Sequence, residues 1–307
     1  MFRVKLLQFL KESWFKMSNK DISLAVLITF IWGINFSVIK LGLGTIDPFF
    51  LAALRFFLTA IPLIFFLPKP DVRFSIVILY GLLFGIGLWG MVNLGIYLGV
   101  SAGVASLILQ FSAYFTIILG FFFFSDKLNK VQLFGMLVSM LGLIVSLVYK
   151  DVSASLFALF LVVIAALSMG LCNVIAKKSS PKNMLSFLAW SSLFSPIPLL
   201  LIAFTTNKDF ALVPALSNID LLGWFSILFQ VYITTLFGYW AWIGLLKKYP
   251  ISTVAPISLL VPIFGFIGSI ILFQEPITLM KLVSTILILL GLVFFIFSYK
   301  MQRFIKA

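Results

Sequence analysis

The chain contains no histidine and a single cysteine, Cys172, and these two absences exclude several kinds of site. Histidine is the commonest metal ligand and the usual side chain that exchanges protons near neutral pH. One cysteine excludes a disulfide framework and a cysteine-based metal centre. We therefore predict no metal, no cofactor and no catalytic residue in this chain.

Charged residues are also scarce, at 10% of the 307 residues, whereas 63% of the residues are hydrophobic. Water-soluble domains are about 45–50% apolar and about 25% charged. The composition is therefore typical of a helical membrane protein that crosses the lipid bilayer several times. The net charge of +13 does not indicate a nucleic-acid partner, because the basic residues lie in short segments between apolar runs.

Ten apolar segments reach about 20 residues, the helix length that crosses a bilayer core of about 30 Å. The predicted spans are residues 22–43, 48–67, 74–98, 103–124, 130–149, 153–176, 183–205, 219–246, 251–273 and 279–300. Short connections with helix-breaking residues, such as Asp47-Pro48 and Tyr249-Pro250, separate them. We expect an all-α integral membrane protein with ten transmembrane helices.

The basic residues are distributed unequally between the two ends of these spans. With the N-terminus in the cytoplasm, 17 of the 22 Lys and Arg residues lie on the cytoplasmic side and four on the other, with Arg55 inside a span. The positive-inside rule therefore predicts that both termini are cytoplasmic.

Residues 1–20 are basic but lack the short apolar core and cleavage site of a secretory signal. An apolar stripe formed by Leu6, Leu10, Trp14 and Met17 is typical of an amphipathic helix on the cytoplasmic lipid surface. A basic tail without stable structure is the alternative. Residues 301–307 are predicted to be a second cytoplasmic tail.

The two halves of the chain, residues 21–150 and 151–300, resemble each other weakly. The matching strings are Phe124-Ser125-Asp126 with Phe273-Gln274-Glu275, Leu141-Gly142 with Leu290-Gly291, and Trp32-Gly33-Ile34-Asn35 with Met169-Gly170-Leu171-Cys172. Each half contains five predicted spans, and an odd number places the second copy upside down in the membrane. Two inverted five-helix repeats around a central cavity are typical of carriers that work by alternating access.

Arg55 is the one formal charge that the predicted spans place in the membrane interior, away from the span ends. Such an arginine costs about 2.5–3.5 kcal/mol on insertion scales, and less if its side chain reaches back to the interface. One interpretation is structural, with the guanidinium snorkelling towards the outer side. The other is attraction of an anionic substrate group, because the planar fork of donors suits a carboxylate.

Uncharged polar and aromatic residues within the spans are the other candidates for substrate binding. They are Trp32, Asn35, Asn93, Gln110, Tyr114, Asn173, Tyr239 and Trp240, joined by Lys40 near the outer end of the first span. Each also suits a structural role, because hydrogen bonds between membrane helices are common and contribute about 0.6 kcal/mol on average. Trp32 lies in mid-span, which is typical of a cavity wall, whereas Trp89, Trp190 and Trp224 suit packing or the membrane interface.

Small residues in the third span and prolines in the ninth predict local features of the helices. The third span carries Gly81, Gly85, Gly87, Gly90, Gly95 and Gly99. This spacing lets helix backbones approach closely and indicates packing. Pro256 and Pro262 each remove a backbone donor, so we expect kinks there, and a kinked helix beside a cavity is a candidate gate.

The string Trp32-Gly33-Ile34-Asn35-Phe36 through Lys40, with Asp126 and Glu275 closing the fourth and ninth spans, resembles the EamA family of the drug/metabolite transporter superfamily. The resemblance covers about residues 21–300 and is strongest to bacterial exporters of O-acetylserine and cysteine. It implies a carrier with spans one, three, four, six, eight and nine around a central cavity. The usual Gly-Glu of the family is replaced by Ser125-Asp126 and Gln274-Glu275, a mild departure that leaves the implied fold unchanged. Members of the family carry very different metabolites, so the resemblance implies the fold more strongly than the substrate.

Together these observations predict a bacterial inner-membrane exporter of small zwitterionic molecules, amino acids or derivatives such as cysteine and O-acetylserine, acting as a monomer or homodimer. No histidine or membrane-embedded carboxylate is available to carry protons, so we expect facilitated diffusion or exchange. A carrier of another metabolite, a drug-like or a lipid-like compound is the alternative. An integral membrane enzyme is a remote one, because the carboxylates are scattered over loops.

Overall fold

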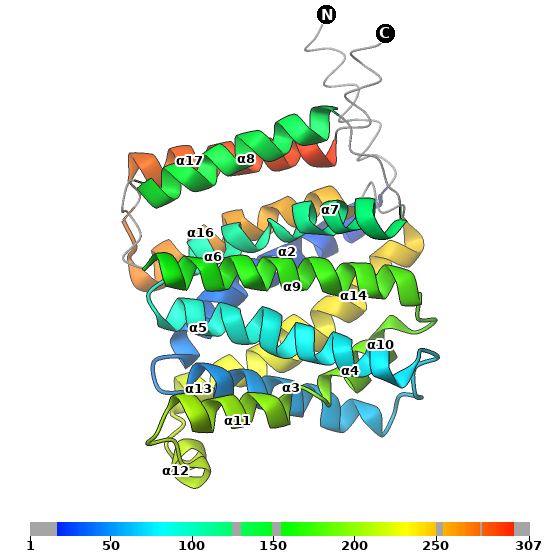
Figure 1. Cartoon of the computed structure of the whole chain (residues 1–307), viewed down its shortest axis with the longest axis vertical. Coiled ribbons are helices and arrows are strands. Elements are labelled where there is room, and N and C mark those ends of the chain that lie inside the picture. The colour runs from blue at the N-terminus through cyan, green and yellow to red at the C-terminus, as the bar shows by residue number, and fades with distance from the viewer. Residues whose placement is uncertain (1–16, 125–129, 149–154, 250–253, 277, 298–307) are drawn as a thin grey trace, which may run out of the picture.

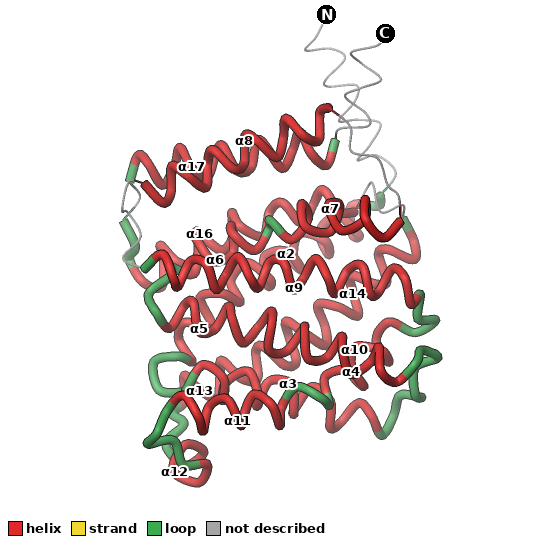
Figure 2. Tube along the Cα trace, in the orientation of Figure 1, coloured by secondary structure: helices red, strands yellow, loops and turns green. Residues whose placement is uncertain are grey.

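The computed structural model describes residues 17–124, 130–148, 155–249, 254–276 and 278–297. Within these ranges the chain consists of helices and loops and contains no strand (Figure 2). Residues 1–16 of the predicted amphipathic stretch 1–20, the C-terminal tail and Asp126 lie outside the described residues.

The helices occur in the two halves of the chain that the sequence pattern indicates. The first half contains α2 (Asn19–Gly42), α3 (Pro48–Ile64), α4 (Phe74–Leu82), η1 (Leu83–Gly90), α5 (Met91–Tyr97), α6 (Ala102–Leu109), α7 (Ser112–Phe124) and α8 (Lys130–Val148). The second contains α9 (Leu156–Ser179), α10 (Met184–Ser192), α11 (Pro196–Thr206), α12 (Leu212–Ser217), α13 (Leu221–Leu228), η2 (Phe229–Phe237), α14 (Gly238–Lys248), η3 (Ala255–Leu259), α16 (Leu260–Phe273) and α17 (Leu279–Ile296). The segments η1 and η2 are π-helical, and η3 is a 3₁₀ helix.

Within the described ranges, six helical stretches are long and apolar enough to cross a membrane. They are residues Asn19–Gly42, Phe74–Tyr97, Ala102–Gly120, Leu156–Ser179, Met184–Thr206 and Leu221–Lys248. Four further apolar helices are shorter, at Pro48–Ile64, Lys130–Val145, Ile257–Phe273 and Leu279–Phe295. The chain is therefore an all-helical protein with several membrane-capable helices, in line with its composition.

Polar residues in the connecting loops determine where several helices begin. The Asp47 carboxylate accepts hydrogen bonds from the backbone N–H groups of Phe49 and Phe50 at 2.9 and 3.1 Å, and Pro48 occupies the first helical position. Asp220 caps α13 in the same way through the N–H of Gly223 at 2.8 Å. Such caps satisfy backbone donors that a helix leaves free at its start.

Besides the third and eighth spans, which contain the π-helical segments η1 and η2, three of the predicted spans are not continuous α-helices. The seventh span is divided between α10 and α11, which begins at Pro196. The fourth is interrupted between α6 and α7 at Gln110. In the ninth, the 3₁₀ segment η3 contains Pro256 and precedes α16, whose first turn contains Pro262. Pro256 and Pro262 therefore each remove a backbone donor near the junction of η3 with α16.

The helices lie side by side, approximately across the long axis of the molecule (Figure 1). The pair α8 and α17 lies at one end of this axis and α12 at the other. The pair is antiparallel, because a Cβ on Gly135 would lie 2.6 Å from the Gly291 carbonyl, and one on Gly142 would lie 2.8 Å from that of Ser284. Only glycine allows such backbone contact.

The glycines of the third span have the packing role that their spacing predicts. A Cβ on Gly81 would lie 2.1 Å from the Ser191 carbonyl oxygen of α10. One on Gly87 would lie 2.5 Å from the Ser168 hydroxyl of α9. The α4–η1–α5 stretch therefore packs closely between two helices of the second half, and the prediction of packing is confirmed.

Candidate functional site

Arg55 lies inside the helical bundle, where 1% of its surface is exposed. Its two terminal nitrogens donate hydrogen bonds across to η2, to the Gln230 side-chain oxygen at 3.3 Å and to the Thr235 hydroxyl at 3.1 Å. Within the described residues Arg55 has no carboxylate partner. The burial excludes the interpretation that this side chain snorkels to the interface.

The indole of Trp89 covers one face of this guanidinium. The Arg55 Cζ atom lies 3.9 Å from the centre of the Trp89 ring, a cation–π geometry that partly replaces lost hydration. Trp89 belongs to η1 and is itself buried. Phe36 of α2 packs near the same indole, with ring centres 6.2 Å apart.

Two of the predicted residues on α2 meet the same segment η2. The Trp32 indole N–H donates to the Thr234 carbonyl at 3.2 Å, and the Asn35 side-chain oxygen accepts from the Thr234 hydroxyl at 3.0 Å. Gly238 leaves room for the Trp32 ring, since a Cβ there would lie 2.6 Å from the indole nitrogen. Thr234 precedes Thr235, so the partners of α2 and of Arg55 are adjacent in the chain.

Aromatic rings extend this cluster along the bundle. Trp32 lies 5.5 Å from Tyr239 and 5.1 Å from Trp242, measured between ring centres. Tyr239 in turn lies 6.2 Å from Phe84 of η1, again measured between ring centres. Trp32, Asn35, Arg55 and Tyr239 are thus gathered around η1 and η2. We call this set, with Trp89, Gln230, Thr234 and Thr235, the Arg55 cluster.

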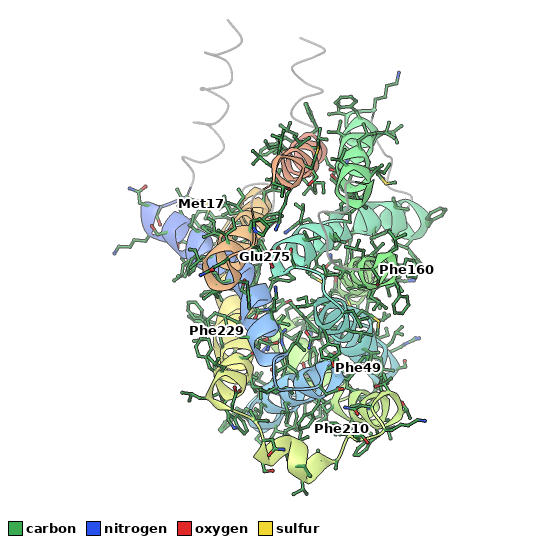
Figure 3. The ribbon with its side chains drawn as sticks, turned by 90° about the vertical axis from the view of Figure 1, so that its left-hand side faces the viewer. Met17, Phe49, Phe160, Phe210, Phe229 and Glu275 are labelled. Atoms are coloured by element: carbon green, nitrogen blue, oxygen red, sulfur yellow. The ribbon has the colours of Figure 1, made fainter. Side chains whose placement is uncertain are left out.

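The other end of α2 carries an ion-pair cluster that joins the two halves. Lys40 Nζ and Lys281 Nζ each lie 3.0 Å from one oxygen of Glu275, which is labelled at the end of α16 in Figure 3. Burial raises the pKa of Glu275, but its polar surroundings, with the two ammonium groups at 3.0 Å, outweigh burial and lower the pKa to about 2. The carboxylate is therefore charged at neutral pH, and Lys40 is paired with Glu275.

A second ion-pair cluster ties the beginning of α2 to the end of α14. One oxygen of Asp21 accepts hydrogen bonds from Lys248 Nζ and from the Tyr249 hydroxyl, both at 2.5 Å, and from the Ser18 hydroxyl at 2.7 Å. These hydrogen bonds lower the pKa of Asp21 well below its usual range. Both ends of α2 are therefore held to the second half of the chain by charged groups.

The remaining predicted residues lie apart from the Arg55 cluster. Asn93 donates to the Pro48 carbonyl at 3.0 Å, and Asn173 donates to the Thr116 hydroxyl at 3.0 Å. Tyr114 shares a hydrogen bond with Ser139 of α8. Four residues complete the set: Gln110 at the interruption between α6 and α7, Trp240 with 62% of its surface exposed, and Pro256 and Pro262 at the start of the ninth span. Substrate binding and gating by these residues stay predictions.

Four members of the cluster were not among the predicted residues. Trp89 was assigned to packing or to the membrane interface, and its burial excludes the interface. Gln230, Thr234 and Thr235 are polar residues in the middle of the eighth span, the same signal that pointed to Asn35. Within the described residues, no three His, Cys, Asp or Glu side chains lie together as a metal site requires.

A family model described as the EamA-like transporter family matches the chain twice, over residues 19–148 and 156–297. The two matches correspond to the two halves. A protein of Salmonella typhimurium, named a probable amino-acid metabolite efflux pump, is 37% identical over 295 residues, which are 94% of this chain and 98% of that protein. A protein of Escherichia coli with the same name is 34% identical and covers 95% of this chain and 99% of its own length.

A solved structure is similar in fold. A crystal structure with 16% sequence identity and a TM-score of 0.54 covers 88% of this chain and 97% of its own chain. At this identity the likeness concerns the helical fold alone.

Proposed function

Because the chain belongs to the EamA-like transporter family, we propose that it is a multi-pass carrier of the bacterial inner membrane that exports amino acids or their derivatives. Two relatives of nearly equal length, both named amino-acid metabolite efflux pumps, support the substrate class. The cysteine and O-acetylserine type of metabolite follows from the resemblance of the sequence. The unequal distribution of basic residues supports cytoplasmic termini.

The observation that carries this proposal is the relation between the two halves. Leu141-Gly142 and Leu290-Gly291 are matching strings on α8 and α17, and these two helices run antiparallel. Matching helices that run in opposite directions are expected of inverted repeats. The two π-helical segments support the same relation, since η1 and η2 interrupt the third span of each half.

The helix contacts support it further, because they are reciprocal. Helix α2 of the first span packs on α16 of the ninth, and α9 of the sixth packs on α7 of the fourth. Likewise η1 packs on α9, and η2 packs on α2. Exchanging the two halves leaves this pattern unchanged, as a two-fold axis between them requires.

We infer that all ten apolar segments cross the bilayer. The four shorter helices are close to the necessary length: α3, with 17 residues, is about 26 Å long at about 1.5 Å per residue. A bilayer core of about 30 Å adapts to such a helix by local thinning or by flanking residues that reach the interface. With five spans in each half, both termini then lie on the same side.

We propose alternating access as the mechanism, with the two halves rocking about the Arg55 cluster. This cluster lies where helices of both halves meet, and α2 is joined to the second half by an ion-pair cluster at each end. Opening towards one side requires breaking the ion pairs at that side. The chain is therefore a carrier in this proposal, with no enzymatic role.

The experiment is transport by the purified protein in sealed vesicles. We expect counterflow of radiolabelled O-acetyl-L-serine or L-cysteine in vesicles that contain the protein, and none in vesicles without it. Absence of counterflow for both compounds would contradict the proposed substrate class. An imposed pH gradient tests the coupling: facilitated diffusion or exchange predicts no uphill accumulation, so proton-driven accumulation would refute it.

A further inference from the structure

The Arg55 cluster contains a buried positive charge whose partners in the described chain are neutral. Its two acceptors are the Gln230 amide oxygen and the Thr235 hydroxyl, and the Arg55 Nε–H has no acceptor. A buried charge without a counterion is costly, and neutral hydrogen bonds with one stacked indole offset only part of that cost. The site therefore favours a partner that brings a negative charge.

Further donors in the same region also lack an acceptor. These are the Asn35 side-chain nitrogen, the Thr59 hydroxyl and the Trp89 indole nitrogen, all buried and without a partner in the part of the chain that the structure describes. Trp89 stacks on Arg55, Thr59 lies one helical turn beyond it on α3, and Asn35 bonds the residue next to Thr235. A group rich in acceptors, such as a carboxylate, would suit this excess of donors.

The two π-helical segments position the side chains that surround the Arg55 guanidinium. Trp89 lies in η1, and Gln230 and Thr235 lie in η2, so both segments contact the same guanidinium. The Thr235 hydroxyl is turned by a hydrogen bond of 2.7 Å to the Gln230 carbonyl five residues earlier, the spacing of a π-helical turn. Such short π-helical stretches occur frequently at functional sites, because they redirect side chains within a helix.

We propose that Arg55 is a specificity-determining residue that binds the carboxylate of the transported molecule. The two terminal nitrogens exchange Gln230 and Thr235 for the two carboxylate oxygens, in the bidentate geometry that suits a guanidinium. Trp89 holds the guanidinium plane during this exchange. This inference rests on the proposed function and adds to it a ligand class: free acids are accepted, and compounds with a blocked carboxyl group are not.

The experiment compares an acid with its amide on matched variants. The full-length protein, purified in detergent, is titrated with O-acetyl-L-serine and with O-acetyl-L-serinamide, and affinity is measured by thermal stabilisation. Arg55→Gln is compared with Arg73→Gln, which removes an exposed arginine at the beginning of α4. We expect the wild type and Arg73→Gln to prefer the acid, and Arg55→Gln to bind the acid about 10- to 100-fold more weakly with no preference.

A second variant covers the possibility that Arg55→Gln fails to fold. Gln230→Glu places a carboxylate beside Arg55 in the shape of the present side chain, so it competes with the ligand from within the protein. We expect this variant to be folded and to lose affinity for the acid. Wild-type affinity for the acid in either folded variant would overturn the inference. If the wild type and Arg55→Gln transport O-acetyl-L-serine equally well, only the inference fails. If the wild type neither transports nor binds either probe, the proposed function fails as well.

Discussion

Replacing Glu275 by Gln is expected to weaken the connection between α2 and the end of α16. The carboxylate accepts from Lys40 and Lys281 at 3.0 Å each, and its pKa is lowered from 4.5 to about 2. At about 1.4 kcal/mol per pKa unit, this corresponds to an upper limit of about 3.5 kcal/mol. Lys40 is 31% exposed, so solvent screening reduces the expected loss to about 1–2 kcal/mol.

Thermal unfolding of the purified protein in detergent at pH 7 measures this loss. A decrease of about 1–2 kcal/mol corresponds to a fall in Tm of a few degrees. Asp209→Asn is the matched control, because it removes an exposed carboxylate from the loop between α11 and α12. Equal Tm values for the wild type and Glu275→Gln would refute this account of the ion-pair cluster.

The pH dependence of stability independently tests the direction of the pKa shift of Glu275. A carboxyl group whose pKa is lowered on folding stabilises the folded state above its unfolded pKa, and this stabilisation disappears as the pH falls through the folded value. For Glu275 the window is therefore about pH 4.5 down to about pH 2. The difference in stability between the wild type and Glu275→Gln should be constant near neutral pH and should shrink in that window. A difference that does not change with pH would contradict the assignment.

Two smaller predictions concern other contacts of α2 and use the same unfolding assay. Gly33→Ala should cost about 1–3 kcal/mol, because its Cβ would lie 2.5 Å from the Val261 carbonyl oxygen of α16. Gly244→Ala should not destabilise, since nothing lies within 4 Å of a Cβ there; equal losses in the two variants would contradict the backbone contact. Asp21→Asn should lower Tm less than Glu275→Gln does, because its partner Lys248 is 60% exposed and solvent screens the ion pair. A larger fall in Tm would show that solvent exposure does not determine the strength of these ion pairs.

Composition and breaker residues predicted much of the helical organisation. Apolar length located the segments, and Asp47-Pro48 marked the start of α3 because a carboxylate cap and a proline both suit the first turn. The interruption of the seventh span before Pro196 was missed, although proline is common at a helix start. Apolar length alone does not distinguish one continuous helix from two short ones in line.

The candidate site was predicted in part, and the π-helical segments explain what was missed. Arg55 was found because it is a lone charge among apolar residues. Trp89 was not, because a tryptophan near the middle of a span also suits ordinary packing. A π-helical turn contains an additional residue, so the side chains after it face a different direction from those of a regular helix. Tyr239, two residues after η2, faces the cluster, and its neighbour Trp240 is exposed.

The pairing of Lys40 with Glu275 shows a different limit of prediction from the sequence alone. Both residues were predicted near the outer ends of their spans, so their common side followed from the sequence. Their contact joins residues 235 positions apart and depends on α2 packing against α16. Nothing in the spacing along the chain specifies which of several helix ends will be neighbours.

The close crossing of α2 and α16 at Gly33 has a mechanical consequence. Helix α2 has 24 residues, contacts α16 through its backbone near its middle, and carries a charged contact at each end. Such a helix pivots about the central contact, so a tilt that separates one end from its partner moves the other end towards its own. Simultaneous release at both tips, which would leave a continuous leak through the bilayer, is thereby opposed by the rigidity of one helix.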